Sequence, residues 1–134
     1  MTATEAPPPL DSDLVREFVA NAHGNVDAVR AALDAHPALA NACWDWGGGD
    51  WETGLGAAAH MGRRDIAELL LANGARLDVF AAAMLGEVEV VRAVLAAHPE
   101  ALHALGPHGI PLRAHAEAGG VQARPVLELL DAGA

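Results

Sequence analysis

The chain has 134 residues, a mass of 13.8 kDa and a formal net charge of −10, with 52% hydrophobic and 19% charged residues. This length and apolar content exclude a chain that is disordered throughout, and predict one domain with its own core. The chain contains 31 alanines and no lysine or tyrosine. Because alanine favours helices and strand-forming residues are sparse, we expect an all-α protein.

The net charge and the single cysteine limit the types of partner and the cellular location that we expect. The excess of acids leaves no basic stripe, so we expect neither nucleic acid nor a membrane as partner. The chain has no apolar run long enough to span a membrane, and the single Cys43 excludes an intrachain disulfide, which favours a cytoplasmic protein. Residues 1–10 lack the positive start of a signal peptide and are expected to be a disordered arm before a domain at 11–134.

The chain repeats itself at a fixed offset. Residues 18–37 and 80–99 share identical residues 62 positions apart, among them Phe18/Phe80, Gly24/Gly86, Val26/Val88, Val29/Val91, Leu33/Leu95, His36/His98 and Pro37/Pro99. Residues 54–75 and 111–134 form a second, looser pair. Internal repeats of this length indicate stacked helical units. We therefore predict four helix-turn-helix units, at about 11–37, 54–75, 78–99 and 111–134.

Each unit carries the start and stop signals of two helices. A short alanine-rich segment ends at a glycine, and these glycines are Gly24, Gly62, Gly86 and Gly119. A second segment follows with apolar residues at helical spacing and ends at His-Pro or Gly-Ala. Asp11, Ser12 or Asp13 can cap the first helix. Small side chains in the first helices would let neighbouring units approach closely when they stack.

These residues resemble the ankyrin repeat family. The best match runs from Thr53 to Ala75, with Gly54-Leu55-Gly56 followed by three alanines, then Gly62, Leu69 to Leu71 and Gly74-Ala75. Gly54 stands where the family has proline, and Gly56 where it has histidine. The resemblance implies a solenoid of four stacked helix-turn-helix units. It also implies a non-catalytic scaffold that binds other proteins through its finger loops and concave helix face.

Only two long finger loops are expected, at about 38–53 and 100–110. The first contains all three tryptophans, three consecutive glycines and three acids. Tryptophan is enriched in interface hot spots, and acids favour a basic partner. The finger residues predicted to bind a partner are Trp44, Asp45, Trp46, Asp50, Trp51 and Glu52. The alternative is that the tryptophans form a local mini-core, and a mixed outcome with one buried and two available is favoured.

The family resemblance implies a second set of partner contacts on the concave face. These residues lie just before the glycine of each first helix, and we predict that His23, His60, Met61, Met84 and Glu117 bind the partner there. Methionine suits adaptable apolar contacts. Contacts between units, with little exposure to solvent, are the alternative for the apolar members.

The sequence gives little support for a cofactor, a metal or catalysis. The histidines do not follow a zinc-binding spacing, and His115-Ala-Glu117 lacks the Pro-Cys-x-x-Cys segment that zinc deaminases require. Asp45, Asp50 and Glu52 do not fit an EF-hand, and Cys43 has no basic neighbour. We therefore expect no metal, no cofactor and no enzyme.

The leading hypothesis is a protein-protein interaction module. The first alternative is a self-associating unit that pairs through the C-terminal leucines Leu127, Leu129 and Leu130, because solenoid ends need a polar outer face. The second alternative is a small-ligand protein that uses the tryptophan-rich finger. Many arginines without lysine favour a bacterial source.

Overall fold

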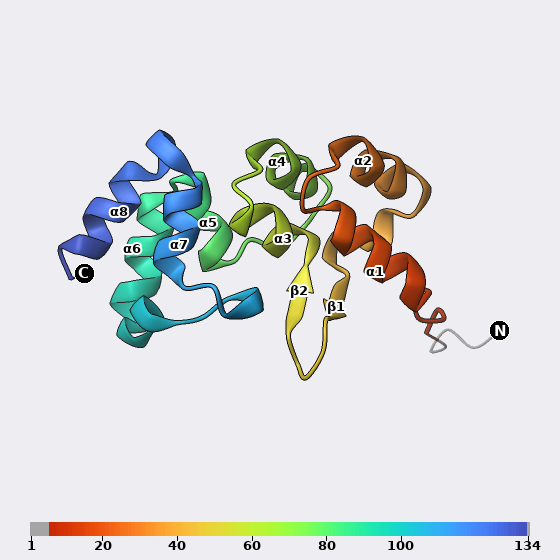
Figure 1. Cartoon of the computed structure of the whole chain (residues 1–134), viewed down its shortest axis with the longest axis horizontal. Coiled ribbons are helices and arrows are strands. Elements are labelled where there is room, and N and C mark those ends of the chain that lie inside the picture. Colours follow the sequence, from red (N-terminus) through yellow and green to blue (C-terminus); the bar gives the residue numbers. More distant parts are fainter. Residues whose placement is uncertain (1–5, 134) are drawn as a thin grey trace.

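The computed structural model describes residues 6–133 (Figure 1). Over this range the chain forms eight α-helices and one two-stranded antiparallel sheet. The prediction of a mostly helical chain is confirmed, and the small sheet is a departure from an all-α fold. Residues 6–10 are exposed without regular structure, and the first half of the predicted arm, 1–5, lies outside the described residues.

The helices follow one another as four pairs, which lie side by side along the long axis in Figure 1. The pairs are α1 (Ser12–Asn21) with α2 (Val26–Ala35), α3 (Gly54–His60) with α4 (Arg64–Ala72), α5 (Val79–Leu85) with α6 (Val88–Ala97), and α7 (Leu112–Ala118) with α8 (Arg124–Asp131). None of these helices is both long enough and apolar enough to cross a membrane.

The short first helices pack against one another through alanine. Helix α5 contacts both α3 and α7, and α3 also contacts α1. Residues 57–59 of α3 and 81–83 of α5 are all alanine, and all are fully buried. Because the methyl side chain is small, these helix backbones can approach closely, and larger side chains at these positions would push the helices apart.

Three of the four glycines at the predicted helix ends, Gly62, Gly86 and Gly119, serve two different purposes. Gly62 and Gly86 adopt left-handed backbone angles, with φ of 66° and 80°, as expected for a residue that ends a helix. Gly119 instead has a φ of −74°, and a Cβ there would lie 2.0 Å from the carbonyl oxygen of Met84. The next residue, Gly120, takes the left-handed angle. Gly119 is therefore needed for close helix packing rather than for a turn.

The internal repeat is visible in the backbone at the two His-Pro sites. His36 ends α2 with φ −139° and ψ 77°, and His98 ends α6 with φ −136° and ψ 79°. A 3₁₀ helix follows each, η1 (Pro37–Asn41) and η2 (Pro99–His103). Residues 62 apart thus end equivalent helices in the same way, because proline disfavours helical geometry in the residue before it.

The two long fingers differ in structure. The first forms a hairpin of β1 (Cys43–Asp45) and β2 (Trp51–Thr53), which projects from the helices in Figure 1. The second contains η2 and the short η3 (Pro107–Gly109), with one isolated bridge between Leu105 and Pro111. The side chain of Thr53 accepts a hydrogen bond from the backbone of Gly56 and so caps α3 where the hairpin ends.

Two predictions about apolar exposure are wrong. Met84, predicted to bind a partner, is fully buried, because α7 and the following η4 (Gly120–Ala123) both pack over α5. Among the C-terminal leucines, Leu129 and Leu130 are buried within the chain and Leu127 is partly buried. These leucines pack inward and do not form the free apolar face on which the self-association hypothesis relied.

Candidate functional site

Three histidines and one glutamate from four separate segments meet beside the hairpin. His23 follows α1, Glu52 is the middle residue of β2, His60 ends α3, and His108 lies in η3. One ligand atom from each of the four side chains lies within 4.8 Å of the other three. We call these four residues the His-Glu cluster.

The alternation of side chains along the hairpin explains how Glu52 reaches the cluster. Trp44 pairs with Glu52 across the strands, and both point to the face that we call inner. Trp44 packs against the core, and the side chain of Glu52 is fully buried. Asp45 and Trp51, the neighbouring cross-strand pair, point to the opposite, outer face. The hairpin therefore separates a buried polar cluster from an exposed surface.

The buried carboxylate of Glu52 is the centre of the cluster. Its Oε2 lies 2.9 Å from Nε2 of His60, and its Oε1 accepts a hydrogen bond of 2.8 Å from the indole nitrogen of Trp46. The same Oε1 lies 3.2 Å from Nε2 of His23 and 3.2 Å from Nε2 of His108. Each of the three imidazoles thus presents its Nε2 atom to a single carboxylate.

The contacts of Glu52 keep it ionised. Burial alone would raise the pKa of its carboxyl group, because a charged group is less stable away from water. The hydrogen bonds from His60 and Trp46 and the charges of His23 and His108 outweigh this effect, so the pKa lies below its ordinary value. The cluster therefore contains a buried negative charge at neutral pH.

The other ring nitrogen is also held in two of the three histidines. Nδ1 of His23 lies 3.0 Å from the carbonyl oxygen of Val19 and 3.1 Å from that of Ala20. Nδ1 of His108 lies 2.7 Å from Oδ2 of Asp50, whose Oδ1 accepts from the backbone N–H of His108 at 2.7 Å. These contacts fix the ring orientations and point both Nε2 atoms at Glu52.

The pair of Asp50 and His108 shifts both pKa values towards the charged forms. The backbone N–H of His108, followed by its side chain, lowers the pKa of Asp50. Partial desolvation would lower the pKa of His108, but the hydrogen bond to Asp50 and the charges of Glu52 and Asp50 raise it above its ordinary value. The second finger is thereby bound to the hairpin by an ion pair as well as a hydrogen bond.

The three acids of the first finger are engaged within the molecule. Asp45 accepts hydrogen bonds from the backbone of Gly47 and Gly49 and so closes the turn of the hairpin. Asp50 binds His108. Glu52 is buried, so the prediction that Glu52 contacts a partner is wrong. A glycine-rich loop becomes ordered when its polar groups find hydrogen-bond partners within the molecule. In this hairpin the acids make those hydrogen bonds.

The tryptophans match the mixed outcome that the sequence favoured only in part, because Trp44 is partly buried rather than buried. Trp44 packs inward, while Trp46 is 38% exposed and Trp51 is 59% exposed. Of the predicted concave contacts, Met61 is 51% exposed and Glu117 is exposed on α7. His23 and His60 are directed to the cluster rather than to open solvent.

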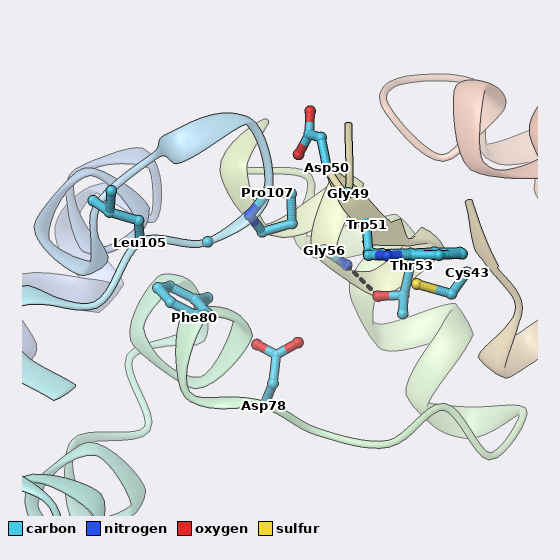
Figure 2. A pocket seen from close by; sticks show the side chains of 11 residues that line it. Cys43, Gly49, Asp50, Trp51, Thr53, Gly56, Asp78, Phe80, Leu105 and Pro107 are labelled. Atoms are coloured by element: carbon cyan, nitrogen blue, oxygen red, sulfur yellow. Dashed lines mark hydrogen bonds between the residues drawn. The ribbon is translucent and has the colours of Figure 1, made fainter. Parts of the chain in front are cut away.

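A groove of about 390 Å³ lies between the hairpin and the second finger (Figure 2). In Figure 2 Trp51, Cys43 and Thr53 lie on one side of it, Leu105 lies on the other, and Phe80 and Asp78 lie below. Trp51 and Cys43 also line a second groove of about 270 Å³, which includes Leu10 and Val15. Trp51 therefore stands between two shallow apolar depressions.

His108 was not among the site residues predicted from the sequence. It lies 58 residues after Asp50 and 48 after His60, in a loop without metal-ligand spacing. The one usable signal is that His23 and His60 occupy similar positions at the ends of first helices in successive units. That signal places two imidazoles near each other, but it does not bring the second finger to them.

Comparison with known protein families, with curated proteins and with solved structures found no match to this chain.

Proposed function

We propose that this chain is a non-catalytic protein-binding module of the ankyrin-repeat type, which recognises its partner through the outer face of the hairpin. The proposal is supported by the four helix pairs, which coincide with the units where the family-like residues occur. It is also supported by the hairpin, which extends from those pairs as a separate protrusion (Figure 1). Repeat proteins of this kind use extended surfaces and fingers to bind other proteins.

The observation that carries the proposal is the exposure of Trp51. Its side chain is 59% exposed on an ordered hairpin, between the two grooves that it lines. A large rigid aromatic residue on a fixed support loses little conformational entropy on binding and can bury much apolar area, which is the profile of a hot spot. The neighbouring depressions can accept apolar side chains of a partner.

The charge of the chain favours a basic partner. Because the three acids of the hairpin are engaged internally, this preference rests on the overall net charge of −10 rather than on those acids. Long-range attraction of this kind acts mainly on the rate of association and weakens with added salt.

The state of Cys43 supports a non-catalytic role. Partial burial raises the pKa of its thiol, and the nearby charge of Glu52 raises it further. A thiol with a raised pKa is protonated at neutral pH and is a poor nucleophile. Cys43 is thus better suited to contribute apolar surface next to Trp51 than to attack a substrate.

The test is a quantitative capture experiment with single substitutions. Wild-type protein, Trp51→Ala and Val121→Ala are immobilised at equal density, and bound proteins from the source organism are quantified by mass spectrometry. Val121 is a matched control because it is 70% exposed and lies in η4, far along the chain from the hairpin. All three proteins are first compared by circular dichroism.

The proposal predicts at least one protein that is held by the wild type and by Val121→Ala but reduced at least tenfold by Trp51→Ala. A hot-spot tryptophan contributes over about 2 kcal/mol, which corresponds to a loss of this size or more. Equal capture of every bound protein by Trp51→Ala and the wild type would contradict the proposal.

A further inference from the structure

We propose that the His-Glu cluster is a binding site for a divalent transition-metal ion of the zinc type, coordinated by Nε2 of His23, His60 and His108 and by the carboxylate of Glu52. This site goes beyond the proposed binding function, because it assigns an inorganic ligand to the inner side of the hairpin.

The positions of the ligand atoms are the first argument. The four atoms lie within 4.8 Å of one another although they come from four segments of the chain. A tetrahedral zinc site with bonds of about 2.0–2.2 Å requires ligand atoms about 3.3 Å apart. Two of the contacts to Glu52 are already 3.2 Å long, and no two atoms of the set are more than 4.8 Å apart.

The orientation of the imidazole rings is the second argument. A carbonyl oxygen can only accept a hydrogen bond, so Nδ1 of His23 donates to Val19 and Ala20. This contact directs Nε2 of His23 at the carboxylate of Glu52. The contact between Nδ1 of His108 and Asp50 directs Nε2 of His108 at the same carboxylate. The ring nitrogens that face Glu52 are therefore the ones through which these histidines can bind a metal ion.

The outer contacts are those that metal sites commonly show. Histidine ligands usually donate their second ring N–H to a carboxylate or a backbone carbonyl, and ligating carboxylates are themselves hydrogen-bonded. Asp50 has this role for His108, Val19 has it for His23, and the indole of Trp46 donates to Glu52. The cluster therefore has both a ligand set and the groups that orient it.

The donor types select the class of metal. Imidazole nitrogen suits zinc and its transition-metal neighbours, whereas Ca²⁺ and Mg²⁺ prefer oxygen ligands. Cys43, the one thiol of the chain, lies on the outer side of the hairpin and lines the grooves there. Four protein ligands fill a tetrahedral shell, as in structural sites, so we expect the ion to fasten the two fingers together.

The test measures metal binding directly. Protein without a polyhistidine tag is stripped with EDTA and titrated with Co²⁺, whose visible absorption reports tetrahedral coordination, and then with Zn²⁺ in competition. The variants are His60→Ala, His108→Ala, Glu52→Gln and Asp50→Asn. The matched control is His98→Ala, because His98 is an exposed histidine outside the cluster. Circular dichroism shows which variants remain folded.

The expected result is one ion per chain with a tetrahedral Co²⁺ spectrum that Zn²⁺ abolishes. Loss of an orienting group typically costs about 10–100-fold in affinity, which is the range expected for Asp50→Asn. Loss of a ligand in His60→Ala, His108→Ala or Glu52→Gln should cost more than about 100-fold, and His98→Ala should bind as the wild type does.

The variant His108→Ala can test the proposal even if the other variants unfold, because His108 lies in a loop. Three results would overturn the proposal. The first is no binding of Zn²⁺ or Co²⁺ by the wild type, which leaves a hydrogen-bonded network only. The second is an octahedral Co²⁺ spectrum. The third is equal affinity of the wild type and folded His108→Ala.

Discussion

Asp50 and His108 lie 58 positions apart in the sequence and are joined through both oxygens of the Asp50 carboxylate. Oδ1 accepts from the backbone N–H of His108 and Oδ2 meets Nδ1 of its ring, each at 2.7 Å. The contact holds the second finger against the hairpin and turns the free edge of the imidazole towards Glu52. The His-Glu cluster depends on this contact for its fourth side chain.

The backbone of His108 is strained, and the cost of this strain can be measured. Its φ is 61°, a left-handed angle that costs a residue with a Cβ about 1 kcal/mol more than glycine. His108→Gly and His108→Ala both remove the imidazole, but only glycine relieves the strain. We expect His108→Gly to be about 1 kcal/mol more stable than His108→Ala in urea denaturation. Equal stability of the two variants would mean that the finger relaxes once the ring is removed.

Gly86 is expected to tolerate no side chain. Its φ is 80°, and a Cβ there would lie 2.1 Å from the carbonyl oxygen of Gln122, on the backbone that packs over α5. The substitution Gly86→Ala should cost about 3 kcal/mol or more in free energy of unfolding, because backbone must move.

Gly74 provides the control for Gly86. It has a φ of 92°, and a Cβ at this position would meet no heavy atom within 4 Å beyond its chain neighbours. The substitution Gly74→Ala should cost only the backbone term of about 1 kcal/mol. Urea denaturation of both variants separates packing from backbone strain. Similar costs for the two would show that the close approach at Gly86 is not rigid.

The two methionines predicted for the concave row should differ sharply. Met84 is fully buried, so Met84→Ala leaves a cavity and should cost about 2–5 kcal/mol. Met61 is 51% exposed, and Met61→Ala should change the free energy of unfolding by no more than about 0.5 kcal/mol. Thermal and urea denaturation measure both. A large effect at Met61 would show that its exposed position hides a packing role.

The contrast between Met84 and Met61 shows what the sequence could predict. Helix pairs, their order and most of their ends follow from local signals such as His36-Pro37 and Gly86, and these were predictable. The burial of Met84 was not, because it depends on how far η4 extends over α5. Gly119 and Gly120 determine the direction in which the backbone enters η4. Only the packed structure shows that Gly120 makes the turn and that Gly119 allows the helices to pack closely.

The cluster shows a second limit of sequence reasoning. The local composition indicates that the segment with Trp46, Asp50 and Glu52 is unusual. From composition alone, however, the acids are predicted to be surface groups that bind a basic partner. Their actual role requires histidines from two helix ends and from the second finger. Contacts across 58 residues are fixed by stacking of the units, and no spacing rule in the sequence records them.

His115 should make stability depend on pH. It is fully buried in α7, its Nδ1 bonds to the carbonyl oxygen of Pro111, and its Nε2 has no hydrogen-bond partner among the described residues. Burial lowers its pKa, the bond to Pro111 and the charge of Asp78 oppose this, and the charge of His60 adds to it. The folded chain therefore binds a proton at His115 less readily than the unfolded chain.

The sign of the effect follows from proton binding. Below the unfolded pKa of about 6.5, the unfolded chain takes up a proton that the folded chain does not, so stability falls as the pH falls. The slope from this one group is at most about 1.4 kcal/mol per pH unit. Urea denaturation from about pH 7.5 to about pH 5.5, which brackets that pKa, should show a smaller loss of stability in His115→Leu than in the wild type. The exposed-site control His98→Leu should follow the wild type, and an identical profile for His115→Leu would contradict the assignment.

Anomalous X-ray scattering at the zinc edge, from crystals grown with one equivalent of Zn²⁺, tests the proposed metal site most directly. We expect one strong peak per chain, bounded by Nε2 of His23, His60 and His108 and by the carboxylate of Glu52. A map without a peak at that position, or with peaks only at exposed histidines such as His36 and His98, would contradict a metal site in the His-Glu cluster.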